Sequence, residues 1–148
     1  MTTDIEQLQA RLQRLEDLEE IRHLFESYGF YLDRGMWSDY ASLFAEDGKL
    51  RLGPVRADGR EAIEVAAREQ LGARFDPTGE KVGLVHLIGS PQIAIDGDTA
   101  TSEVMWTVVS RGADDSATVT SQGRHMDDLV REGGRWRIAR RRGFQDIP

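Results

Sequence analysis

The sequence predicts an α+β fold in which one long N-terminal helix packs on an antiparallel sheet. Hydrophobic residues recur every three or four positions over the first part of the chain. Beyond Gly79 the segments are rich in Val, Ile, Thr and aromatic residues and are separated by turn signals. Helices first and strands afterwards are typical of α+β proteins. A length of 148 residues suits one core, so we expect a single domain over residues 1–148.

The long helix is predicted from a hydrophobic series with helical spacing. Its members are Ile5, Leu8, Leu12, Leu15, Leu18, Ile21, Leu24 and Tyr28. Such spacing is typical of an amphipathic helix. Thr3 or Asp4 can cap its start, and Gly35 stands where the helix has to end.

Shorter elements follow. A second helix is expected over residues 37–44, and a short strand, KLRL, between Gly48 and Gly53. A third helix is expected to begin at Asp58 and to cover residues 60–71. The remaining predicted strands are residues 82–88, 91–95, 99–110, 117–130 and 135–142.

Composition excludes several classes of function. A formal net charge of −7 and a pI near 5.0 argue against nucleic acid as a partner. The chain has no cysteine, which removes disulfides and thiolate chemistry. It has no apolar stretch long enough for a signal peptide or a membrane span, so we expect a cytoplasmic protein without a membrane partner. Nucleotide-binding, zinc-protease and α/β-hydrolase motifs are missing, and no metal or cofactor is expected.

His86 and Asp33 are the candidate chemical groups. His86 lies in the apolar segment GLVHLIG, so we expect it to be at least half buried and to need a hydrogen-bond partner. Asp33 ends the otherwise apolar helical turn YGFYL. Two interpretations stay open at this point: a buried structural histidine beside an ordinary helix-end carboxylate, or a carboxylate that orients a general base.

Three segments together resemble a known family. YGFYLDRGMWSDYASLFAEDGKL, VHLIGSPQIAIDGDTATSEVMW and GRHMDDLVREGGRWRIARRR, in this order, are similar to the SnoaL-like branch of the nuclear transport factor 2-like superfamily, from about Glu20 to Arg142. The resemblance implies a cone-shaped α+β barrel: N-terminal helices on a strongly curved, mixed but mainly antiparallel sheet that encloses a pocket. Scytalone dehydratase, bile-acid 7α-dehydratase and hexachlorocyclohexane dehydrochlorinase belong to this family and use an Asp–His pair in the cavity.

The resemblance implies a function as well as a fold. It implies a cofactor-independent lyase, a dehydratase or related β-eliminating enzyme, or an isomerase, acting on a small hydrophobic cyclic molecule. A polyketide cyclase, an epoxide hydrolase or a non-catalytic binding module of the same fold remain alternatives. Family members commonly associate through the outer face of the sheet, so we also expect a homo-oligomer, a dimer or a trimer.

The resemblance assigns candidate site residues. His86 is the implied base, Asp33 its partner and Tyr28 the donor to a substrate oxygen. His125 stands where the family usually has tyrosine, and either tunes the pocket or carries a second proton. The sequence itself offers aromatic candidates for contact with substrate, with plain core packing as the alternative: Tyr31, Trp37 and Trp106.

One arginine of the last strand is also a candidate. If Trp136 and Ile138 face the core, strand alternation places Arg140 and Arg142 on the same face, with Arg137 and Arg141 pointing the other way. One of these two arginines could reach the cavity and stabilise a developing anion, as in some family members, and Arg142 is the one favoured. A salt bridge to Asp127, to Asp128 or to a neighbouring subunit is the alternative.

Overall fold

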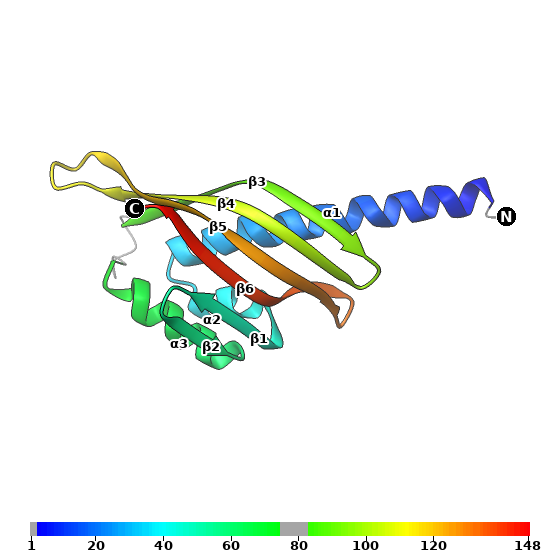
Figure 1. Ribbon diagram of the computed structural model, residues 1–148, viewed down its shortest axis with the longest axis horizontal. Helices are drawn as coiled ribbons and strands as arrows, with labels where there is room; N and C mark the ends of the chain where they lie inside the picture. The colour runs from blue at the N-terminus through cyan, green and yellow to red at the C-terminus, as the bar shows by residue number, and fades with distance from the viewer. Residues whose placement is uncertain (1–2, 75–82) are drawn as a thin grey trace.

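The computed structural model describes residues 3–74 and 83–148, in which helices cover one face of a six-stranded sheet (Figure 1). The helices are α1 (Asp4–Asp33), α2 (Trp37–Ser42) and α3 (Arg60–Leu71), followed by a 3₁₀ turn over Gly72–Arg74. The strands are β1 (Phe44–Leu52), β2 (Val55–Asp58), β3 (Leu84–Asp96), β4 (Thr99–Arg111), β5 (Ala117–Glu132) and β6 (Arg135–Ile147).

The strand order is β2-β1-β6-β5-β4-β3. Only the β1–β6 pairing is parallel, and the other neighbouring strands are antiparallel. Within the described residues β2 and β3 are the two edges, so the sheet curves around the helices without closing. This arrangement confirms the predicted fold class, helices on a mixed and mainly antiparallel sheet.

Helix α1 has the predicted boundaries. Thr3 and Glu6 form a capping box, in which each side chain accepts a hydrogen bond from the other residue's backbone N–H. Just beyond Asp33 the chain turns at Gly35, whose φ of 66° is a conformation that glycine adopts without strain. Local capping and turn chemistry therefore set both ends of the helix.

Only the second half of α1 packs on the sheet. The core cluster includes Ile21, Leu24, Phe25, Tyr28 and Leu32 from this half. The first half extends beyond the sheet as a single helix (Figure 1). The hydrophobic residues of the first half are exposed, so the predicted series is not one continuous buried face.

A group of polar contacts joins α1 to the end of β5 and the start of β6. Asp17 accepts hydrogen bonds from Trp136 Nε1 at 3.1 Å and from Arg131 Nη2 at 2.9 Å. One turn later, Glu20 accepts from the backbone N–H of Trp136 at 2.8 Å. These bonds connect the middle of α1 to the β5–β6 end of the sheet.

Several predicted boundaries are wrong. Helix α2 ends at Ser42 and not at residue 44, and β6 continues beyond residue 142 to Ile147. Strand β1 begins at Phe44, before the KLRL segment, because a register shift lets it pair with β6 over a longer stretch. Asp58 ends the short edge strand β2 and does not start a helix, since Gly59 is the N-cap of α3. The two strands expected around Pro91 are one strand, β3, because a bulge between Gly89 and Gln92 accommodates the proline at the sheet edge.

Two further points concern the limits of the chain. Val82, the first residue expected in the β3 region, lies outside the described residues. Among the described helices, none combines the length and the apolar character that crossing a bilayer requires.

Candidate active site

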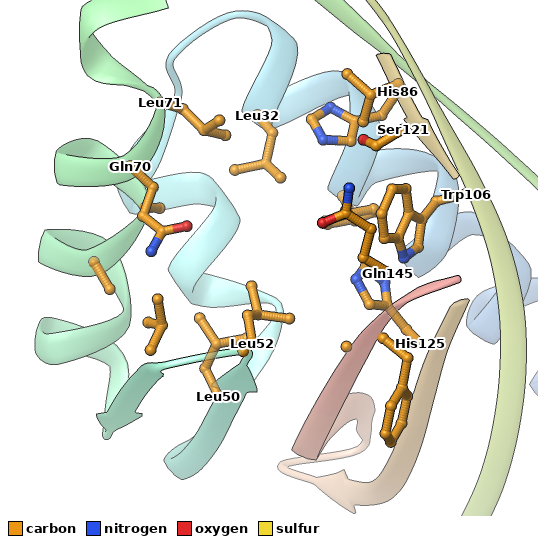
Figure 2. A pocket seen from close by; sticks show the side chains of 18 of the residues that line it. Leu32, Leu50, Leu52, Gln70, Leu71, His86, Trp106, Ser121, His125 and Gln145 are labelled. Atoms are coloured by element: carbon orange, nitrogen blue, oxygen red, sulfur yellow. The ribbon is translucent and has the colours of Figure 1, made fainter. Parts of the chain in front are cut away.

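A cavity of about 530 Å³ lies between α3, the β1–β2 hairpin, the end of α1 and the inner face of the sheet. Its lining residues are Tyr28, Leu32, Tyr40, Leu50, Leu52, Gly53, Pro54, Val55, Ala66, Ala67, Gln70, Leu71, His86, Trp106, Val108, Ser121, His125, Gly143, Phe144 and Gln145. The two walls differ in character. Figure 2 shows the leucines of α1, β1 and α3 facing His86, Trp106, His125 and Gln145 across the space.

Asp33 and His86 meet where α1 crosses β3. Gly29 makes this close approach possible, because a Cβ there would lie 3.3 Å from the carbonyl oxygen of His86. Asp33 follows one helical turn later. Its Oδ1 lies 2.7 Å from His86 Nδ1, and its two carboxylate oxygens accept from the backbone N–H of His86 at 3.1 and 3.0 Å.

This geometry sets the tautomer of His86. An ionised carboxylate only accepts hydrogen bonds, so the neutral form of the imidazole in this contact has its proton on Nδ1 and its lone pair on Nε2. Both side chains are largely removed from water, with 9% of His86 and 8% of Asp33 exposed. The imidazole ring is directed toward the cavity (Figure 2). The arrangement can present a basic nitrogen to a bound molecule.

Tyr28 lies between the two histidines of the cavity. Its ring centroid is 5.6 Å from that of His86 and 5.2 Å from that of His125, both in edge-on geometry. Burial raises the pKa of Tyr28 above its usual value, although the Arg141 guanidinium opposes this shift. Burial also raises the pKa of Tyr40, to about 12, again against the opposing effect of the Arg141 guanidinium. Both phenols therefore keep their protons at neutral pH and can act as hydrogen-bond donors.

His125 is the second histidine of the cavity wall and is only 4% exposed. Burial, the positive charge of Arg141 and the proximity of His86 lower its pKa well below the usual value. Its Nδ1 has no hydrogen-bond partner among the described residues. At neutral pH His125 is thus a neutral ring and does not supply a positive charge.

Trp106 forms the wall beside His125, with 5.9 Å between the ring centroids. It pairs with Gly123 on the neighbouring strand and covers it. A Cβ at Gly123 would overlap the indole ring and the carbonyl oxygen of Phe144. The missing side chain at this glycine is what lets the indole pack close to the sheet.

The alternation expected for the last arginines is wrong. Register shifts between β5 and β6 leave Ala139 without a paired residue, because Leu129 pairs with Ile138 and Asp128 with Arg140. This bulge inverts the faces beyond Ile138, so that Arg140 is exposed and Arg141 is fully buried. Arg142 is not among the residues that line the cavity.

Arg141 instead forms a buried ion pair that sequence reasoning missed. Its Nε and Nη2 donate to Asp127 at 2.9 and 2.7 Å, and neither side chain has exposed surface. Its Cζ lies 4.5 Å from the ring centroid of Tyr28. Nothing in the sequence marks the bulge. His125, Asp127 and Leu129 alternate along β5 and are all buried. This alternation is the signal that could have predicted a buried Asp127 and, with it, a buried cationic partner.

Two expected contact residues lie elsewhere. Tyr31 and Trp37 are partly buried, pack against the core and are absent from the cavity lining. In their place, the structure adds polar groups that the sequence did not single out, Ser121 and Gln145 on the sheet and Gln70 on α3. No group of three or more His, Cys, Asp or Glu residues able to hold a metal ion occurs in the described part of the chain.

The chain belongs to the SnoaL-like domain family, whose sequence model matches residues 13–142. A crystal structure of an NTF2-like protein with a cystatin-like fold from Novosphingobium aromaticivorans is 29% identical, with a TM-score of 0.83 over 97% of this chain and 90% of that chain. The shared architecture extends over nearly the whole chain.

Two further structures of this fold are similar. A second Novosphingobium aromaticivorans protein, whose assignment as a scytalone dehydratase is provisional, is 22% identical, with a TM-score of 0.75 over 90% of this chain and 87% of that chain. A Catenulispora acidiphila protein in complex with S-DNPA is 25% identical, with a TM-score of 0.70 over 87% of this chain and 92% of that chain. No curated protein matches the chain.

Proposed function

We propose that the protein is a cofactor-independent lyase or isomerase, of the dehydratase or related β-eliminating type, with His86 as general base. The observation that carries the proposal is the 2.7 Å contact between His86 Nδ1 and Asp33 at the cavity wall. A carboxylate in this position holds the imidazole in one orientation and stabilises the imidazolium that forms when Nε2 accepts a proton.

The elimination proceeds by proton transfer alone. Nε2 of His86 removes a proton from a carbon next to an activating group, and the electrons of that C–H bond form the C=C bond. The leaving oxygen departs with its bonding pair and takes the proton back from the imidazolium, which gives alkene and water. In an isomerisation the proton returns to a different carbon. Neither route needs an oxidant, a reductant or a metal.

The phenol of Tyr28 is the proposed donor to the substrate oxygen on which negative charge develops. It is protonated at neutral pH, and the buried guanidinium of Arg141 lies 4.5 Å from its ring centroid. A positive charge at this distance between two buried side chains favours any shift of the phenol proton toward the substrate. Arg141 would thus act as a positioning residue, through Tyr28.

The cavity supports a small hydrophobic cyclic substrate. A volume of about 530 Å³ is in the range of small-molecule sites. One wall is leucine-rich, whereas the other carries His86, Ser121 and Gln145. A ring system with an apolar edge and an oxygen-bearing edge fits this division. The complex of the Catenulispora relative with S-DNPA supports ligand binding within this fold.

A substrate screen with a matched variant tests the proposal. Cyclic β-hydroxy ketones, halides and enones are incubated with the protein, and the conjugated product is followed by its ultraviolet absorbance. We expect turnover with the unmodified chain and a loss of roughly 10²- to 10⁴-fold in His86→Gln, the usual contribution of general-base assistance.

Binding of the same compound is measured in parallel. The amide of His86→Gln can keep a hydrogen bond to Asp33, so the affinity and the melting temperature should change little. Unchanged turnover in His86→Gln would contradict the proposed base. Binding to both proteins without turnover in either would indicate a ligand-binding module instead.

A further inference from the structure

The first half of α1 carries an apolar stripe that its own domain does not cover. Ile5, Leu8, Leu12 and Leu15, hereafter the apolar seam, are between 56% and 68% exposed. None of them belongs to the hydrophobic core of the described residues. Four large hydrophobic side chains in a row on a projecting helix are unusual on a protein surface that has no partner.

The seam lies on the wrong side of the helix to reach the sheet. At about 3.6 residues per turn, its residues point to the side of α1 roughly opposite the side of Ile21, Leu24 and Tyr28, which are buried against the body. Bending of the helix toward its own domain would therefore leave the seam exposed. No described part of the domain can therefore cover the seam, whereas a second molecule can.

The spacing identifies the kind of partner. The seam residues are separated by three, four and three positions, which is the a and d pattern of a coiled coil. In this frame Arg11 occupies a g position and Glu16 the following e position, and both are exposed. In a parallel pair of identical helices, the g residue of one helix faces the next e residue of the other.

We propose that the apolar seam pairs with the same seam of a second copy of this chain in a parallel coiled coil. Arg11 of each copy then faces Glu16 of the other, an attractive pair. In the antiparallel arrangement of the same seam, g faces g, and the two copies of Arg11 repel one another. Because each body lies on the side of α1 away from the seam, the two domains sit on the outer flanks without collision. The interface lies apart from the outer sheet face and leaves the cavity open.

The absence of cysteine in the chain allows a direct test of orientation. In a parallel pair, position 12 of one helix lies beside position 12 of the other, within the distance that a disulfide can bridge. We expect Leu12→Cys in the full chain to form a disulfide-linked dimer under mild oxidation. Ala10→Cys, on the same helix but away from the seam, is the control and should remain uncrosslinked.

Association is then measured by sedimentation over a wide concentration range. We expect a dimer whose dissociation constant rises about tenfold or more in Leu12→Glu, with an unchanged near-ultraviolet circular dichroism spectrum because Leu12 lies outside the packed core. Arg11→Glu should also weaken the dimer, and the double variant Arg11→Glu, Glu16→Arg should restore it. A monomer at all concentrations, a dimer insensitive to Leu12→Glu, or equal crosslinking at positions 10 and 12 would overturn the proposal.

Discussion

At the scale of single residues, the two cavity histidines have opposite surroundings although they share one wall. His86 has a carboxylate on its Nδ1, whereas His125 has a cation nearby and no partner for its Nδ1 among the described residues. A neighbouring anion stabilises the imidazolium, and a neighbouring cation destabilises it. The proposed division of roles, a base at His86 and a neutral wall at His125, follows from this difference.

His125 should make the protein sensitive to mild acid. Its pKa is lowered well below 6.5 in the folded state. Above the unfolded-state pKa the ring is neutral in both states and has no effect on pH dependence. Below the unfolded-state pKa the unfolded chain binds a proton that the folded chain does not. The free energy of unfolding therefore decreases as the pH is lowered, by at most about 1.4 kcal/mol per pH unit.

Urea denaturation at pH 7.5 and at pH 5.5 measures this effect. The free energy of unfolding should fall less between the two pH values in His125→Gln than in the unmodified protein, by about 1 kcal/mol. Because only the difference between pH values is compared, any constant loss from the substitution cancels. The same pH dependence in both proteins would show that His125 titrates normally in the folded state.

At the scale of elements, the position of α1 depends on the contacts of Asp17. Asp17→Ala would leave the buried Trp136 Nε1 without an acceptor, and we expect a loss of about 1–3 kcal/mol in unfolding free energy. Glu19→Ala, an exposed residue on the same helix, is the control and should change stability by less than about 0.5 kcal/mol. Thermal or urea unfolding measures both, and equal effects would contradict a special role of Asp17.

The elements differ in how well the sequence predicts them. Helices α1 and α3 could be predicted because helical periodicity is a local property, and capping also indicated the start of α1. Strand β2 was missed because four residues at a sheet edge carry little pattern. The bulge at Ala139 was missed because it depends on the register between two strands, and it moved the buried cation from Arg142 to Arg141.

At the scale of the whole molecule, the contact between Asp33 and His86 depends on the complete fold, since 53 positions separate them in sequence. The residues alone left a structural histidine and a catalytic one both open, although they already suggested Asp33 as the partner of His86, and the family resemblance favoured the catalytic interpretation. The core of the site could therefore be predicted. Its polar rim, Gln70, Ser121 and Gln145, could not, because their convergence depends on how α3 faces the ends of two strands.

The most direct test of the central claim is hydrogen exchange at carbon, because it reports proton removal without requiring that the natural leaving group be known. A cyclic ketone that binds the cavity is incubated in deuterated water with the protein, and the loss of its α-proton signal is followed by nuclear magnetic resonance. The account predicts catalysed exchange with the unmodified chain and a rate in His86→Gln lower by roughly 10²-fold or more. Equal exchange rates in the two proteins, with the ketone bound to both, would contradict it.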